Sequence, residues 1–147
     1  MNVRIKLMRD GAKLPHRAHP TDAGADIFYC PEENKPCLIH SGQSNVIPTG
    51  VRAEVPQGYM LEVKNKSGIA SKRQLIVGAC VVDSGYDGEI FVNLHNIGKG
   101  TQVINPGEKV AQVVLVPITT CGFSEAEGEI NGSSSRGSGG FGSTGNT

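Results

Sequence analysis

The chain has 147 residues, the size of one ordinary domain, which excludes an assembly of several catalytic domains. Fourteen Lys and Arg residues balance fourteen Asp and Glu residues, so the net charge is zero. That balance excludes a basic surface that covers the whole molecule and binds nucleic acid. Twenty Gly and eight Pro residues, with no Trp, favour a turn-rich all-β domain over a helix bundle.

Alternating apolar and polar residues predict short strands along most of the chain. The expected strands cover residues 3–7, 45–55, 59–63, 75–82, 90–94 and 109–116. Turn-forming Gly, Pro, Asn and Asp residues separate them, and residues 67–73 are the one segment expected to form a short helix. Short strands at this spacing predict a sandwich or a closed barrel.

Targeting and metal-binding patterns are missing from the sequence. No apolar run reaches the roughly 20 residues that a bilayer-spanning helix needs, and the N-terminus alternates where a signal peptide would be apolar. We therefore expect a cytoplasmic protein without membrane contact. The four cysteines form no C-x-x-C pair and the four histidines have no ligand spacing, so no zinc site is expected.

Two short polar segments combine acidic or basic residues with glycine. The segment 22–27 is either a structural turn or the source of a carboxylate that holds waters of a Mg²⁺ ion. In the segment 65–72, Ser67 is available as a helix N-cap. Lys66 beside the same helix start also favours a bound anion such as phosphate. Both interpretations of each segment stay open.

Asp83 lies where one strand runs through a glycine-containing turn into the next, which predicts a β-hairpin with a carboxylate at its rim. The carboxylate either caps the turn by accepting backbone amides or acts as a general base toward water. The backbone of such a hairpin can also bind a nucleotide base. Gln112 interrupts an apolar strand, and its side chain either faces solvent or orients a water or phosphate oxygen.

The composition changes after Phe123, because residues 125–147 are rich in Gly and Ser and have few large apolar side chains. One interpretation is a disordered tail. The other is a flexible arm that binds a polyphosphate with its backbone amides and Arg136 and stacks Phe141 on a base. Gly137, Gly139 and Gly142 spell G-x-G-x-x-G, but no βαβ unit surrounds them, so a dinucleotide-binding fold is not expected.

These segments, in this order, resemble the five motifs of the homotrimeric deoxyuridine triphosphatase (dUTPase) family. The matching residues are 23–26, 66–70, 78–89, 107–112 and 136–145, and the similarity runs from about residue 3 to residue 145. The resemblance implies an all-β, jelly-roll-like β-barrel of the β-clip type over residues 1–124, with one short helix. It also implies a flexible arm over residues 125–147 that closes over an active site, and a homotrimer with shared active sites.

The resemblance implies hydrolysis of dUTP to dUMP and pyrophosphate by attack of water on the α-phosphorus. This reaction limits uracil incorporation into DNA and supplies dUMP for thymidylate synthesis. Asp83 would deprotonate the water, and Asp26 would hold waters of a Mg²⁺ ion bound mainly by the substrate phosphates. The implied substrate-binding residues come from the last four motifs: Lys66, Ser67, Gly68, Gly78, Val82, Tyr86, Gln112, Arg136, Gly140, Phe141, Gly142, Ser143 and Thr144.

The implied roles divide the nucleotide into parts. The backbone of residues 78–82 would bind uracil, and Tyr86 would pack beneath the deoxyribose and exclude a 2′-hydroxyl.

Two positions depart from the family pattern. Asn65 and Lys66 stand where the family has Pro-Arg. The lysine ammonium is a single point of charge, whereas an arginine guanidinium could form two parallel hydrogen bonds to a phosphate. Cys80 stands where the family has a glycine, and if this position lies close to uracil, its thiol must point into the barrel.

Two other functions remain as alternatives. A dCTP deaminase-like enzyme can use the same β-fold. The metal-dependent deaminases are excluded, because their H-x-E and P-C-x-x-C signature is missing. A catalytically silent module could bind nucleotide only to regulate a protein partner. No direct contact with nucleic acid is expected in any of these cases.

Overall fold

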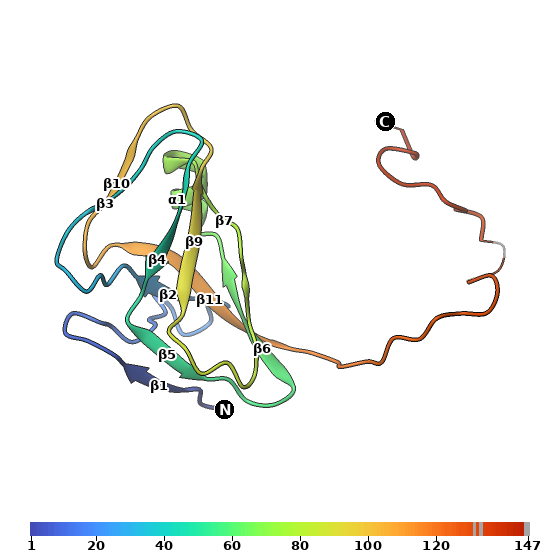
Figure 1. Ribbon diagram of the computed structural model, residues 1–147, viewed down its shortest axis with the longest axis horizontal. Coiled ribbons are helices and arrows are strands. Elements are labelled where there is room, and N and C mark those ends of the chain that lie inside the picture. Colours follow the sequence, from blue (N-terminus) through green and yellow to red (C-terminus); the bar gives the residue numbers. More distant parts are fainter. Residues whose placement is uncertain (131, 133, 146–147) are drawn as a thin grey trace.

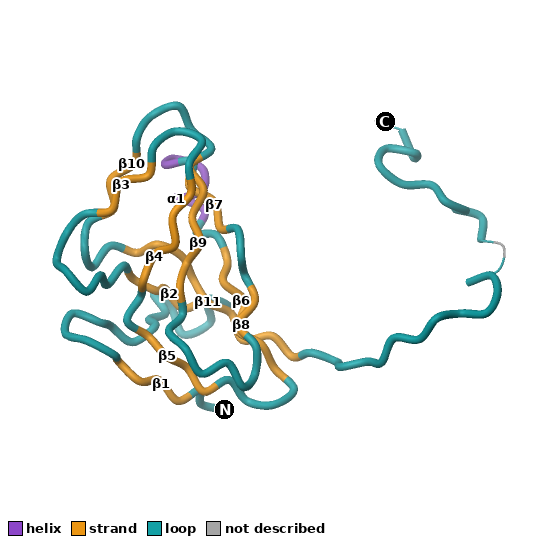
Figure 2. Tube along the Cα trace, viewed as in Figure 1, coloured by secondary structure: helices purple, strands orange, loops and turns teal. Residues whose placement is uncertain are grey.

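The computed structural model describes residues 1–130, 132 and 134–145, which form short strands and one short helix (Figures 1 and 2). The elements, in chain order, are β1 (Arg4–Leu7), β2 (Ala25–Phe28), β3 (Cys37–Ile39), β4 (Ser44–Pro48), β5 (Val51–Glu54), β6 (Tyr59–Lys64), α1 (Ser67–Arg73), β7 (Leu75–Val77), β8 (Val81–Val82), β9 (Phe91–Asn96), β10 (Gln102–Ile104) and β11 (Lys109–Pro117).

The strands form antiparallel sheets with the orders β2-β11-β6-β8, β4-β9-β7, β1-β5 and β10-β3. The predicted all-β, jelly-roll-like fold with one short helix is confirmed. Within the described residues, the strands do not form one closed barrel, because their hydrogen bonds divide them among separate sheets. Long β11 joins β2 to β6, so it brings together segments far apart in the sequence.

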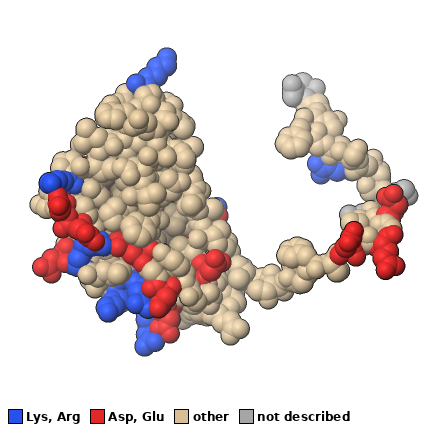
Figure 3. Space-filling view, viewed as in Figure 1, with Lys and Arg blue, Asp and Glu red and all other residues tan. Residues whose placement is uncertain are grey.

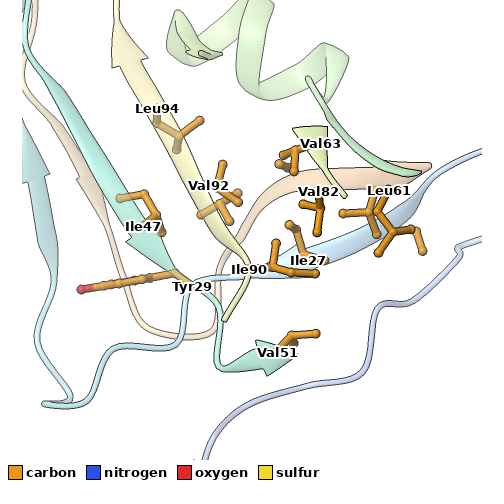
Figure 4. Close-up of a cluster of buried hydrophobic side chains, with 14 of the residues drawn as sticks. Ile27, Tyr29, Ile47, Val51, Leu61, Val63, Val82, Ile90, Val92 and Leu94 are labelled. Carbon is orange, nitrogen blue, oxygen red and sulfur yellow. The ribbon is translucent and has the colours of Figure 1, made fainter. Parts of the chain in front are cut away.

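The hydrophobic core takes alternate side chains from the two larger sheets (Figure 4). On β9, Val92 and Leu94 are buried, while their neighbours Phe91 and Asn93 are more exposed. Ile27 of β2 and Val63 of β6 belong to the same buried cluster. Removing each aliphatic side chain of this size from water contributes about 1.5–3 kcal/mol to folding. The period-two pattern in the sequence therefore reflects one shared core.

The predicted strand over residues 45–55 is wrong as a single element, because it breaks between β4 and β5. Gly50 at the break has a positive φ of 68°, and a Cβ atom there would lie 2.8 Å from Cβ of Ala12. This close approach requires glycine. The short strands β3 and β10 were not predicted, since three residues are too few to establish an alternation.

The predicted strand over residues 75–82 also divides, and the predicted hairpin of residues 81–82 with 90–94 is wrong. β7 pairs with β9, whereas β8 pairs with β6 in the other sheet. Residues 78–80 therefore cross from one sheet to the other. The loop between β8 and β9 then returns the chain from the sheet that contains β8 to the sheet that contains β9. Asp83 lies at the start of this loop.

The predicted helix over residues 67–73 is confirmed as α1, but of the two interpretations of its start, the one with Ser67 as N-cap is wrong. Lys66 occupies the N-cap position in an extended conformation, with no side-chain capping hydrogen bond. Gln74 ends the helix in the left-handed conformation and donates its backbone N–H to the Ile69 carbonyl. Among the described helices, none is long and apolar enough to cross a membrane.

Beyond β11 the chain leaves the packed body and extends away from it (Figure 1). Ile118 still donates its backbone N–H to the Gly58 carbonyl, at 2.9 Å. Residues 131, 133, 146 and 147 of the predicted arm lie outside the described residues. The division of the chain at residues 124 and 125 stays a prediction.

Candidate active site

The first group of polar residues surrounds the buried carboxylate of Asp26 on β2. Lys66 and Lys109 both form ion pairs with it, and Nζ of Lys109 lies 2.7 Å from Oδ2. Burial raises the pKa of Asp26, but the hydrogen bonds from Lys109 and Lys66 outweigh it, and the pKa lies below its ordinary value. Asp26 is therefore ionised at neutral pH and shared between two ammonium groups.

Gln112 on β11 lies between this carboxylate and the end of β6, because its register partners are Asp26 and Lys64. Its Nε2 donates a hydrogen bond to the backbone carbonyl of Asn65, at 2.8 Å. A Cβ atom on Gly24 would lie 2.1 Å from Oε1 of Gln112, so a larger residue there would displace the Gln112 amide. The structure thus brings residues from the predicted first, second and fourth motifs together.

Ser67 and Gly68 begin α1 directly after Lys66, and both are exposed. The preceding residue, Asn65, accepts a hydrogen bond on Oδ1 from the Val77 backbone N–H, at 2.7 Å. This bond ties the start of the helix to the end of β7. The predicted phosphate-binding residues are therefore fixed next to the segment that contains Gly78.

Gly78 begins the crossing between the two sheets, and its backbone is exposed. A Cβ atom there would lie 2.3 Å from Oδ1 of Asn93 and 2.4 Å from Nε2 of His95. Oδ1 of Asn93 also accepts the Ala79 backbone N–H, at 3.3 Å. The backbone predicted to bind uracil is therefore held by side chains of β9.

Asp83 is exposed at the start of the loop after β8, whereas Val82 before it is buried in the core. The Asp83 backbone carbonyl accepts the Tyr86 backbone N–H, at 3.2 Å, so the turn is closed without the carboxylate. Asp83 and Tyr86 line a cavity of about 180 Å³. The hydroxyl of Tyr86 donates to the Glu89 carbonyl, at 2.9 Å.

The structure does not bring Asp83 together with Lys66 within one chain. Asp83 follows Val82, which lies opposite Leu61 on β6, whereas Lys66 lies beyond the other end of that strand. At about 3.3 Å per residue, five or six residues of extended chain separate the two positions by roughly 17–20 Å. Both side chains cannot contact the same phosphate group of one nucleotide at that distance.

The predicted arm residues lie apart from both groups (Figure 1). Arg136, the one basic residue after β11, hydrogen-bonds through Nε to the Gly139 carbonyl at 3.0 Å, and Phe141 is fully exposed. Acidic side chains occupy the first part of the arm (Figure 3). The remaining predicted contacts on the arm are also exposed: Gly140, Gly142, Ser143 and Thr144.

Lys109 is a charged neighbour of Asp26 that the sequence analysis did not identify. Lys109 and Gln112 are three residues apart, which places them on opposite faces of a regular strand. The register of β11 against β2 shifts between Lys109 and Ala111, and such an irregularity re-aims a side chain. The shift allows Lys109 to reach the Asp26 carboxylate while Gln112 stays in register with Asp26, and no sequence pattern indicates it.

Comparisons with known proteins identify the family. A family model described as dUTPase matches residues 10–145. The deoxyuridine 5′-triphosphate nucleotidohydrolase of Chlamydia pneumoniae is 43% identical over 92% of each chain. A variant of the Staphylococcus bacteriophage 80alpha dUTPase, solved with dUpNHpp, is 30% identical with a TM-score of 0.86 over 98% of each chain. A variant of the S. aureus phage phi11 dUTPase, studied for its coordination of a structural Mg(II) ion, is 28% identical with a TM-score of 0.78 over 87% of this chain and 98% of that one. The chain therefore belongs to the dUTPase family.

Proposed function

We propose that this protein hydrolyses dUTP to dUMP and pyrophosphate. The observation that supports it most directly is the exposed Asp83 carboxylate, which lines a cavity with Tyr86 in a member of the dUTPase family. The named relatives and the motifs over residues 10–145 support the same activity. The reaction limits uracil incorporation into DNA and supplies dUMP.

In the proposed reaction, a carboxylate oxygen of Asp83 takes a proton from water. The water oxygen forms a bond to the α-phosphorus, and the bond from this phosphorus to its bridging oxygen breaks, which releases pyrophosphate. Lys66 and Arg136 neutralise the phosphates, while Ser67 and Gln112 position their oxygens. Phosphoryl transfer depends mainly on such positioning and charge neutralisation.

Selectivity for the nucleoside follows from the backbone of residues 78–82 and from the ring of Tyr86. Uracil has an N3 donor and an O4 acceptor, whereas cytosine has the reverse pattern, so a backbone fitted to uracil leaves polar groups unpaired with cytosine. Such mismatches give about 10⁴–10⁵-fold discrimination. The ring of Tyr86 packs beneath the deoxyribose, and Phe141 of the arm stacks on uracil.

Magnesium fits this site as an ion held mainly by the substrate. In the described residues, no group of three or more His, Cys, Asp or Glu side chains could hold a metal ion, and Asp26 already pairs with two lysines. Asp26 would therefore contact the ion through water. Magnesium bound to the triphosphate would supply positive charge that stabilises the phosphate oxygens.

We also propose a homotrimer in which subunits share active sites. The separation of Asp83 from Lys66 along β6 supports sites that are built from two chains. Exposed apolar side chains on the body, Val46, Val81 and Phe91, are suited to subunit contacts. The arm extends away from the body (Figure 1), and its Arg136 and Phe141 would complete the site of a neighbouring copy.

The test is a pyrophosphate-release assay with dUTP and the four standard dNTPs in the presence of Mg²⁺. We expect release from dUTP and little from the others. Product analysis with dCTP distinguishes the deaminase, because that reaction gives dUTP and ammonia without pyrophosphate. Binding of dUTP without turnover would instead indicate a silent nucleotide-binding module.

A further inference from the structure

A buried ion pair lies behind the loop that contains Asp83 and Tyr86. The guanidinium of Arg9 contacts both carboxylate oxygens of Glu89, with Nη1 at 2.8 Å from Oε1 and Nη2 at 2.5 Å from Oε2. The side chains are 19% and 8% exposed. This bidentate geometry is the strongest arrangement for such a pair and is specific to arginine.

The same carboxylate is tied to the break between β4 and β5. The Gly50 backbone N–H donates to Oε1 of Glu89 at 2.6 Å, and the Thr49 hydroxyl donates to the Ile90 carbonyl at 2.5 Å. Nη1 of Arg9 also donates to the Cys30 carbonyl, at 2.8 Å. Glu89 and Ile90, at the end of the loop, are therefore held by hydrogen bonds from other segments of the chain. The start of the loop follows the buried Val82.

Glu89 connects this buried pair to the nucleotide-facing surface. Its backbone carbonyl accepts the hydrogen bond from the Tyr86 hydroxyl, at 2.9 Å. A Cβ atom on Gly88 would lie 2.4 Å from the Tyr86 hydroxyl oxygen, so glycine there lets the phenol reach the carbonyl. The tilt of the Tyr86 ring thus depends on the position of Glu89, which depends on Arg9.

We propose that Arg9 is a positioning residue that sets the selectivity for deoxyribose over ribose, acting through Glu89 on the ring of Tyr86. The inference rests on the proposed function, in which this ring excludes a 2′-hydroxyl. An aromatic ring rejects one additional oxygen atom only when the ring cannot move away from it. The buried pair supplies that rigidity from outside the nucleotide site.

The test compares the ratio of kcat/KM for dUTP to kcat/KM for UTP in the wild type and in Arg9→Lys. Lysine keeps the charge but loses the two-pronged contact with Glu89. We expect the ratio to fall at least about tenfold, which corresponds to about 1.4 kcal/mol. Arg17→Lys is the matched control, because Arg17 is exposed and donates from Nε to the Asp22 backbone carbonyl, at 2.9 Å. It should leave the ratio unchanged.

Tyr86→Phe keeps the ring and removes only its hydrogen bond to Glu89. It should lower the ratio by a similar factor, and the double variant with Arg9→Lys should show no further loss. This surface variant also decides the matter if Arg9→Lys fails to fold. An unchanged ratio in Tyr86→Phe, or additive losses in the double variant, would overturn the inference.

Failure of the proposed function has a different signature. A wild-type protein that releases no pyrophosphate from dUTP would refute the hydrolase assignment itself. A wild-type protein that prefers dUTP strongly, together with an equally selective Arg9→Lys variant, would refute only the role of Arg9.

Discussion

Two carboxylates of the candidate site have opposite surroundings. Asp26 is buried and shared by two lysines, so its charge is already neutralised. Asp83 is exposed at the rim of a cavity, and its backbone carbonyl, not its carboxylate, closes the turn. A carboxylate that accepts a proton from water must be accessible to water, so this role suits Asp83 and not Asp26.

Replacement of Asp83 by Asn should leave nucleotide binding nearly intact while turnover falls by about 10²–10⁴, the usual contribution of a general base. Single-turnover rates and calorimetric binding of a non-hydrolysable dUTP analogue measure the two effects separately. Asp87→Asn is the matched control on the same loop, since Asp87 is exposed and pairs with Arg52. Equal losses of binding and turnover would contradict the role of Asp83 as a base.

Glu89 should make stability depend on pH. Burial raises the pKa of its carboxyl, but hydrogen bonds from Arg9 and Gly50 bring the pKa below its ordinary value of about 4.3. A depressed pKa in the folded state contributes stability that is fully present above the ordinary value. This contribution is lost as the pH falls through the folded-state pKa.

Urea unfolding of the wild type and of Glu89→Gln, at a series of pH values below neutrality, tests this expectation. The difference in unfolding free energy should be constant near neutral pH and shrink in acid. Glu54→Gln removes an exposed carboxylate and serves as the control. A difference between wild type and Glu89→Gln that stays constant down to the lowest pH would show that the Glu89 carboxylate contributes nothing through its ionisation.

The sequence identified Asp83, Tyr86 and Lys66 as candidate residues, because each lies in a short segment with glycine or serine at informative spacings. It could not reveal Arg9 or Glu89, which are 80 residues apart and meet only when the break at Gly50 closes around them. Pairing of this kind depends on tertiary packing, which local residue patterns do not encode.

Among the elements, long alternating segments were predicted well, and short or divided ones were not. β6, β9 and β11 have enough residues to show which face is buried. The segment 75–82 also alternates, but its two ends join different sheets. Both ends bury apolar side chains in one core, so alternation alone cannot reveal the change of partner.

The arm is an element that the packed body should not need for folding, since it extends away from the core (Figure 1). Deletion of residues 135–147 should leave a folded body with little dUTP hydrolysis, because Arg136 and Phe141 are lost. Circular dichroism and pyrophosphate release measure the two outcomes. Loss of the β-sheet signal in the truncated protein would show instead that the arm is required for folding.

For the whole molecule, the separated positions of Asp83 and Lys66 predict an assembly. Light scattering coupled to size exclusion should give the mass of three chains. The specific activity should fall on dilution once the assembly dissociates. A protein that has the mass of one chain and full activity would contradict shared active sites.

The placement of Asp83 and Lys66 at opposite ends of β6 has a genetic corollary. Suppose that one inactive allele encodes a chain without Asp83 and another encodes a chain without Lys66. When both alleles are expressed in one cell, mixed trimers form. Some of their shared sites combine the intact Asp83 of one chain with the intact Lys66 of the other. Strains with both alleles should regain growth that neither parent strain shows. Mutations that fail to rescue each other would be those that affect the same half of the shared active site.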